Sequence, residues 1–133
     1  MKKSDSFSLR KRLKSFNFAF NGIRSLINNE HNARIHIFAL ICVFGLGIFF
    51  EIEVTEWIAI TIVSGIVILT ELLNTAIERL ADIVEPDLNE KIGMIKDYCA
   101  GAVLISAIIS LIIGGLIFIP KIIEIIRTFA NTQ

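Results

Sequence analysis

The sequence has few of the residues that build covalent or metal-bound frameworks. It contains two cysteines and two prolines in 133 residues. Cys42 and Cys99 both lie in apolar stretches and form no CxxC pair, so neither a disulfide framework nor a thiolate metal site is expected. Each thiol is expected to pack as a small apolar side chain. The phosphate-binding patterns G-x-x-x-x-G-K-[ST] and G-x-G-x-x-G are also absent from the sequence.

Hydrophobic residues, in contrast, make up 54% of the chain, and the mean hydropathy is +0.71. They gather in three runs, at 35–50, 57–73 and 98–119. A helix needs about 20 residues to cross the roughly 30 Å of hydrocarbon in a bilayer. No signal-peptide pattern precedes the first run. We therefore predict one all-α integral membrane domain over residues 1–133, with three transmembrane helices at about 33–51, 56–80 and 97–119.

The distribution of charge predicts the orientation in the membrane. Residues 1–34 hold eight of the thirteen Lys and Arg residues, whereas the loop 51–56 holds three Glu and no basic residue. By the positive-inside rule the N-terminus is cytoplasmic and this loop lies outside. The sequence thus predicts a multi-pass protein of the plasma or inner membrane.

The segment 7–27 is predicted to be an amphipathic helix rather than a fourth span. Its apolar residues recur at intervals of three and four, with Arg, Lys, Ser and Asn between them. A basic polar face suits anionic head groups, so we expect this helix on the cytoplasmic membrane surface. The alternative is a soluble helix packed on a partner. The apolar positions are Leu9, Leu13, Phe16, Phe20, Ile23 and Ile27.

Small residues follow one another at four-residue spacing in the third run. They are Ala102, Ser106, Ser110 and Gly114. Small residues on one stripe allow close helix packing in lipid, either within the chain or between subunits. A coincidental pattern in a span that tolerates small residues is the alternative.

A polar stretch, TELLNTAIERLAD at 70–82, directly follows the second apolar run. At about 100° per residue, Glu71, Asn74, Glu78 and Asp82 fall within an arc of about 80° on one helix face. At about 1.5 Å per residue, Glu71 lies roughly 22 Å from the outer end of the span, just inside the cytoplasmic edge of the hydrocarbon. An ionised carboxylate in a span costs about 2.5–3.5 kcal/mol, so we interpret this arc as a candidate site.

Carboxylates and cations from the other helix ends are expected at the same interface. Glu30 and Arg34 lie at the entry to the first span, and Lys96 and Asp97 at the entry to the third. Mg²⁺ favours carboxylates together with phosphate oxygens. A divalent ion, a phosphate donor, a lysine and a carboxylate at the depth of a lipid head group indicate phosphoryl transfer onto a lipid alcohol.

Other interpretations stay open on the residues alone. The acidic side chains can serve the structure, with Glu78 or Asp82 paired to Arg79 or Lys96. The span can also belong to an ion or proton pathway or to a small structural membrane subunit. A third alternative is a membrane adaptor whose basic helix recruits partners.

The stretch ELLNTAIERLAD, followed by KIGMIKDYCAGAVL, resembles the prokaryotic diacylglycerol kinase family, which includes undecaprenol kinases. The resemblance covers about residues 9–119. It implies a homotrimer of three-span subunits with an N-terminal surface helix, and active sites shared between neighbouring subunits at the cytoplasmic interface. It also implies ATP as phosphate donor, Mg²⁺ as cofactor and a membrane lipid alcohol as acceptor, with no nucleic-acid partner.

The resemblance also implies roles for single residues. Glu71 matches the general base that takes the proton from the lipid hydroxyl. Glu30 and Glu78 match the carboxylates that hold Mg²⁺ with ATP. Asn74 and Lys11 match residues that orient the substrate or the phosphate.

Nucleotide contacts are implied on every element at the cytoplasmic side. Phe18 falls where the family has an aromatic residue, although Phe lacks a tyrosine hydroxyl. His36 stands where some members carry Glu, and we expect it to be a satisfied histidine near the interface. The residues implied to bind ATP are Lys96, Asp97, Glu30, Glu78, Asp87, Leu88, Asn89 and Phe18.

The acceptor lipid is predicted from two short segments. NEHNARIH and KDYCAGAVL resemble the undecaprenol kinase branch of the family. The sequence therefore favours undecaprenol as the alcohol that is phosphorylated. Diacylglycerol, which would give phosphatidic acid, is the alternative.

Overall fold

The computed structural model describes residues 9–85, 87 and 89–131, with side chains from Arg12 onward. Its helices are α1 (Leu9–Asn29), α2 (His31–Phe49), α3 (Val54–Val84) and α4 (Glu90–Ala130). No strand occurs in this described part of the chain. α2, α3 and α4 each have the length and apolar composition that crossing a membrane requires. The prediction of an all-helical chain with three candidate spans is confirmed.

The helices run further than the apolar runs that predicted them. α3 continues to Val84 and α4 begins at Glu90, so only a short connection separates them. Helical hydrogen bonds do not require apolar side chains, so a helix extends beyond the hydrocarbon until its end is capped. Asn89 caps α4, because its Oδ1 accepts a hydrogen bond from the Lys91 N–H at 3.0 Å.

The connection between α2 and α3 is a tight turn. Glu51 has a positive φ of 50°, in the left-handed region, which lets the chain reverse its direction. Glu53 and Glu56 then form a reciprocal capping box at the start of α3, in which the Glu53 N–H donates to Glu56 Oε2 at 2.8 Å. The turn therefore sends α3 back alongside α2.

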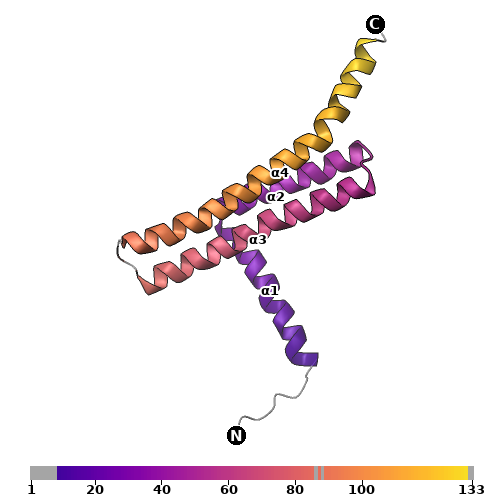
Figure 1. Ribbon diagram of the computed structural model, residues 1–133. Helices are drawn as coiled ribbons and strands as arrows, with labels where there is room; N and C mark the ends of the chain where they lie inside the picture. Colours follow the sequence, from indigo (N-terminus) through magenta and orange to yellow (C-terminus); the bar gives the residue numbers. More distant parts are fainter. Residues whose placement is uncertain (1–8, 86, 88, 132–133) are drawn as a thin grey trace.

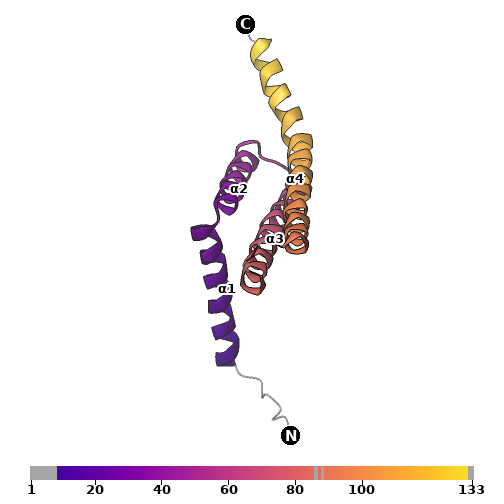
Figure 2. The ribbon, with the colours of Figure 1, turned by 90° about the vertical axis from the view of Figure 1, so that its left-hand side faces the viewer.

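α3 and α4 form a long hairpin, and α2 packs along α3 (Figure 1). α1 leaves this bundle where α2 begins, and its N-terminal end points away from it (Figures 1 and 2). The end of the hairpin that carries the α3–α4 connection reaches past this branch point (Figure 1). Leu26 and Ala33, on either side of the branch, are only 2% and 0% exposed. The α1–α2 junction is thus packed on the bundle, although most of α1 is exposed.

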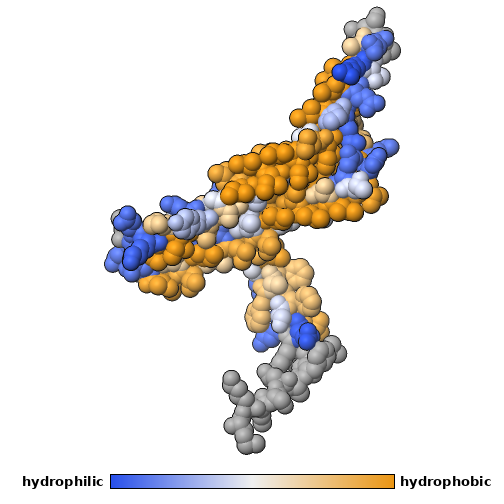
Figure 3. Space-filling model, in the orientation of Figure 1, coloured by the Kyte–Doolittle hydropathy of each residue, from blue (hydrophilic) through white to orange (hydrophobic). Residues whose placement is uncertain are grey.

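Few apolar side chains are buried within the single chain. Near the α2–α3 turn, Ile52, Ile60 and Phe118 form a small core, and Trp57 packs on it edge-on to Phe44, with 5.3 Å between the ring centroids. Elsewhere hydrophobic residues cover the outside of the bundle, and hydrophilic residues gather at its two ends (Figure 3). This distribution suits a bilayer, where lipid tails rather than water contact the apolar surface.

Polar contacts between described residues tie α3 to α4 at three levels of the hairpin. From the α3–α4 connection to the opposite end, they are Lys96–Asp82, Thr70–Ser106 at 2.9 Å and Lys121–Glu56 at 3.1 Å. The first is the ion pair that the sequence offered as the structural alternative for Asp82. Interhelical hydrogen bonds in membranes average only about 0.6 kcal/mol, so these contacts fix the register of the two helices more than they stabilise the fold.

Pro120 lies inside α4. Its ring removes a backbone donor and clashes with the carbonyl four residues earlier, which kinks a helix. The last part of α4 accordingly turns away from the direction of the bundle (Figures 1 and 2).

Gly47 offers a test of the packing beside the α2–α3 turn. A Cβ at this position would lie 2.7 Å from Cη2 and 2.9 Å from Cζ2 of Trp57. We expect Gly47→Ala to lower the free energy of unfolding by about 1–3 kcal/mol, because the indole must move within a packed corner. Thermal unfolding in detergent micelles measures the change.

Gly45→Ala is the matched control, since nothing lies within 4 Å of a Cβ built there. Alanine favours a helix over glycine by about 1 kcal/mol, so this variant should be no less stable than the parent. Equal losses of stability in the two variants would contradict the role of the Trp57 contact.

Candidate active site

Glu71 is a carboxylate held inside the bundle. It is 3% exposed, and it continues the buried face of α3 that includes Ser64, Val67 and Asn74. These positions are three or four residues apart, so they form one stripe along the helix. The polar arc expected from the sequence therefore begins inside the bundle. It does not stay inside, because the Asp82 side chain is 65% exposed.

Asn74 links this buried face to Glu78. Its Nδ2 donates a hydrogen bond to Glu78 Oε1 at 3.0 Å. A carboxylate only accepts, so the amide nitrogen must face Glu78 and the amide oxygen must point the other way. Asn74 Oδ1 is buried and has no hydrogen-bond partner among the described residues. An unpaired buried acceptor costs about 1–3 kcal/mol, which a ligand at this oxygen would offset.

Glu30 reaches the same region from the α1–α2 junction. It precedes α2 with an extended backbone, at φ −104° and ψ 122°. Arg79 of α3 donates to Glu30 Oε1 at 3.0 Å and to Ser25 Oγ at 3.2 Å. The guanidinium thus joins α1, the junction and α3. Arg79 pairs here with Glu30, whereas the sequence had offered Glu78 or Asp82 as its partner.

Titratable groups near Glu71 come from α2, from α3 and from the α1–α2 junction. His36, Glu78 and Glu30 are all close enough to act on Glu71 electrostatically. Within the described residues, no group of three His, Cys, Asp or Glu side chains is arranged to hold a metal ion. Mg²⁺ in phosphate-binding sites is commonly held by one or two carboxylates together with phosphates and waters. The oxygens of Glu30, Glu78 and Asn74 are the hard donors that such an ion prefers, so the donor set fits Mg²⁺.

The other predicted nucleotide residues lie on separate elements. Lys96 pairs with Asp82 on the hairpin, and Asp97 beside it is exposed. Asp87 is exposed in the α3–α4 connection. Most of the predicted site residues thus fall into two sets within one chain. One is the cluster around Glu71, with Glu30, Asn74 and Glu78, and the other is the hairpin end, with Lys96, Asp97 and Asp87.

Four further predicted residues have other surroundings or lie outside the described part of the chain. Asn89 caps α4. Phe18 is exposed on α1, with the Lys14 ammonium 5.9 Å from its ring centroid. The Lys11 side chain and Leu88 lie outside the described residues.

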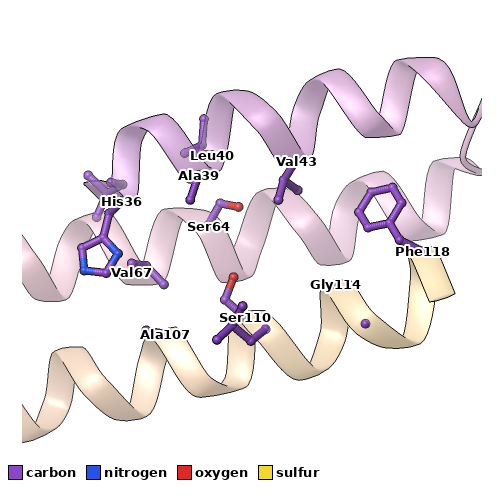
Figure 4. Close-up of a pocket in the computed structure, with 13 residues that line it drawn as sticks. His36, Ala39, Leu40, Val43, Ser64, Val67, Ala107, Ser110, Gly114 and Phe118 are labelled. Carbon is purple, nitrogen blue, oxygen red and sulfur yellow. The ribbon is translucent and has the colours of Figure 1, made fainter. Parts of the chain in front are cut away.

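An apolar cavity of about 470 Å³ lies between α2, α3 and α4 (Figure 4). His36 stands at one end of it, near Val67, and Phe118 stands at the other (Figure 4). Ser110 and Gly114 line it on α4. Val67 lies one helical turn before Glu71, so the His36 end of the cavity is the end nearest the carboxylate.

Members of the small-residue stripe on α4 therefore lie in different environments. Ser106 is buried and contacts α3, whereas Ser110 and Gly114 line the cavity. Ala102 is exposed. Close helix packing is thus limited to part of the stripe.

Sequence reasoning gave His36 no active role, yet it is the histidine that faces the cavity. The signal was its spacing, since Ala33, His36, Leu40 and Val43 are separated by three or four residues along one face of α2. The Arg79–Glu30 contact had no such signal. It joins residues 49 apart in the chain and depends on where α1 leaves the bundle.

Comparison with known proteins agrees with this architecture. Residues 17–118 match the prokaryotic diacylglycerol kinase family. An undecaprenol kinase of Bacillus subtilis is 39% identical over 114 residues, which cover 86% of this chain and 93% of the relative. A diacylglycerol kinase of Synechocystis sp. is 32% identical over 114 residues, which cover 85% of this chain and 65% of the relative. This multi-pass membrane protein therefore belongs to the prokaryotic diacylglycerol kinase family.

Proposed function

We propose that this protein is an ATP- and Mg²⁺-dependent lipid kinase that transfers the γ-phosphate of ATP to the hydroxyl of a membrane lipid alcohol. The observation that carries the proposal is the position of Glu71, a carboxylate 3% exposed within a candidate span. A membrane carboxylate is costly and commonly serves a function. Here it adjoins both a set of hard oxygens and an apolar cavity, which are the two environments that a phosphate donor and a lipid alcohol need.

In this mechanism Glu71 is the general base. Its carboxylate accepts the proton of the lipid hydroxyl as the hydroxyl oxygen attacks the γ-phosphorus. The bond from that phosphorus to the bridging oxygen breaks, and ADP leaves. Burial inside the bundle holds the base where a lipid hydroxyl, rather than bulk water, reaches it.

Glu30, Glu78 and Asn74 are the residues that would hold Mg²⁺. The ion would supply positive charge to the phosphate oxygens. Asn74 is held by its hydrogen bond to Glu78, and its buried Oδ1, which has no partner among the described residues, would accept from the substrate or contact the ion. Lys11 would contact phosphate or a lipid head group. Further contacts to the nucleotide are assigned to Lys96, Asp97, Asp87, Leu88, Asn89 and Phe18.

A homotrimer accounts for the separation of these contacts within one chain. Neighbouring subunits would share each active site, so the hairpin end of one chain can serve the cluster of another. α3 also has an exposed apolar stripe available for subunit packing, with three- or four-residue spacing. It consists of Ile58, Ile62, Ile66, Leu69 and Leu73.

The proposed membrane placement has the N-terminus in the cytoplasm and the site at the cytoplasmic interface of the plasma or inner membrane. Basic residues concentrate before α2, as the positive-inside rule requires. Leu13, Phe16 and Phe20 are exposed on α1, which leaves the bundle at the level of Glu30. We assign this helix to the membrane surface, where those side chains would enter the head-group layer.

Undecaprenol is the favoured acceptor. The apolar cavity is lined by Val67, one helical turn from Glu71, and would take hydrocarbon of the acceptor. The undecaprenol kinase relative has the higher identity, and the match covers nearly all of that protein. Diacylglycerol is the alternative acceptor.

The function is tested by presenting both lipids side by side. Purified protein in detergent micelles with Mg²⁺ and γ-labelled ATP should phosphorylate undecaprenol at a kcat/KM at least about tenfold above that for diacylglycerol, since a tenfold preference needs only about 1.4 kcal/mol. Thin-layer chromatography separates the products. Preference for diacylglycerol would reverse the choice of lipid, and the absence of any labelled lipid would refute the kinase.

Glu71→Gln tests the general base. We expect kcat to fall by about 10²–10⁴-fold, because the amide keeps the shape of the side chain but accepts no proton. The variant should still fold, which a thermal unfolding measurement checks. Glu124→Gln, the same change at an exposed position of α4, is the control and should keep the parental kcat. Full activity of Glu71→Gln would remove the assignment.

Glu78→Gln tests the metal ligands separately. Its side-chain oxygen can still accept from Asn74, but its charge is lost. We expect the Mg²⁺ concentration for half-maximal rate to rise by about tenfold, with part of kcat recovered at high Mg²⁺. A Mg²⁺ titration at fixed ATP measures this, and Glu85→Gln on the same segment is the control. An unchanged Mg²⁺ requirement would exclude Glu78 as a ligand.

A further inference from the structure

Thr70 and Ser106 form a hydrogen-bonded pair between α3 and α4. Their oxygens are 2.9 Å apart, and Ser106 is 5% exposed. The Ser106 hydroxyl also donates to the Val103 carbonyl at 2.8 Å. The Thr70 hydroxyl in turn lies 3.0 Å from the Ile66 carbonyl and 2.9 Å from the Val67 carbonyl of its own helix. Each hydroxyl has one proton, so one of the two hydroxyls donates across to the other helix while the other donates to a carbonyl of its own helix.

This pair lies beside the proposed base. Thr70 immediately precedes Glu71, and the ion pairs that tie the same two helices lie far from it. At about 1.5 Å per residue, Asp82 is roughly 18 Å and Glu56 roughly 21 Å away along α3. Of the polar ties between α3 and α4 in the described residues, Thr70–Ser106 is thus the one that acts at the level of Glu71.

The rotation of α3 about its axis decides where the Glu71 carboxylate points. Side-chain ends stand roughly 6 Å from a helix axis, so a rotation of about 10° moves them roughly 1 Å. A misplacement of about 1 Å can reduce a rate by about 10²-fold. Loss of this hydrogen bond should therefore reduce the rate far more than it reduces the stability of the fold. α3 and α4 stay packed together through many other contacts.

We propose that Thr70 and Ser106 are positioning residues that fix the rotation of α3 against α4 and so aim Glu71 at the lipid hydroxyl. The proposal rests on the proposed function, in which Glu71 is the base. It goes beyond that function by placing a determinant of the rate on a helix that carries no part of the cluster around Glu71.

The test compares Thr70→Val, Ser106→Ala and the double variant with Thr70→Ser. Thr70→Val keeps the shape of the side chain and removes the hydroxyl, whereas Thr70→Ser keeps the hydroxyl. We expect each of the first two to lower kcat by about tenfold or more, with KM for ATP within about twofold of the parent. The double variant should lose no more than either single variant, because one interaction is removed in all three. Thr70→Ser should stay within about twofold of the parental kcat.

Two further measurements separate positioning from general damage. Thermal unfolding should be nearly unchanged in all variants. Labelling of Glu71 by a hydrophobic carbodiimide, mapped by mass spectrometry, should change in Thr70→Val and not in Thr70→Ser, and this readout needs no turnover. Thr61→Val makes the same chemical change at an exposed position of α3 and should change neither kcat nor labelling.

The outcomes distinguish this proposal from the proposed function. Parental kcat in Thr70→Val and Ser106→Ala, with an active parent, overturns the positioning role and leaves the kinase intact. A fall in kcat of the double variant equal to the product of the two single falls also overturns it. So does a fall in kcat that accompanies a lower unfolding temperature. A parent that transfers no phosphate to either lipid overturns both.

Discussion

The structure depends on keeping a carboxylate in apolar surroundings. Glu71 sits within a helix that is apolar enough to cross a membrane, and burial of its charge must be compensated by nearby polar groups or by a ligand. His36 on α2 and the carboxylates of Glu30 and Glu78 act on it electrostatically. Each comes from a different place in the chain, so the position of Glu71 is defined only when α2, α3 and the α1–α2 junction are assembled together.

Membrane surroundings also explain how few side chains are buried inside the single chain. Apolar residues cover much of the outside of the bundle, and a small cluster of buried ones lies near the α2–α3 turn (Figure 3). The middle of the bundle instead contains a cavity and a few hydroxyl groups. A bundle built in this way gains little from burial in a single chain, and lipid or neighbouring subunits must complete its surface.

Much of this architecture was predictable from sequence, because an apolar run of about 20 residues has few regular ways to cross hydrocarbon. The periodicity that placed Glu71, Asn74 and Glu78 on one face was also informative. Periodicity alone does not give burial: Asp82 shares the arc but is exposed, since α3 runs past the start of α2 and α4 is the helix that lies beside it there (Figure 1). The Arg79–Glu30 pair was not predictable, because it depends on the angle at which α1 departs and no local rule gives that angle.

Glu30, the residue at that branch, is also unusual in its interactions. Glu30 stands at the N-cap of α2, yet its side chain makes no capping hydrogen bond, and Arg79 holds it instead. The backbone of Glu30 therefore joins a candidate span to the helix that leaves the bundle, while its carboxylate is one of the proposed Mg²⁺ ligands. If bilayer thickness or head-group crowding tilts α1, the tilt would reach this proposed ligand through a single residue. Catalysis in such a protein would respond to the physical state of the membrane as well as to the concentration of its substrates.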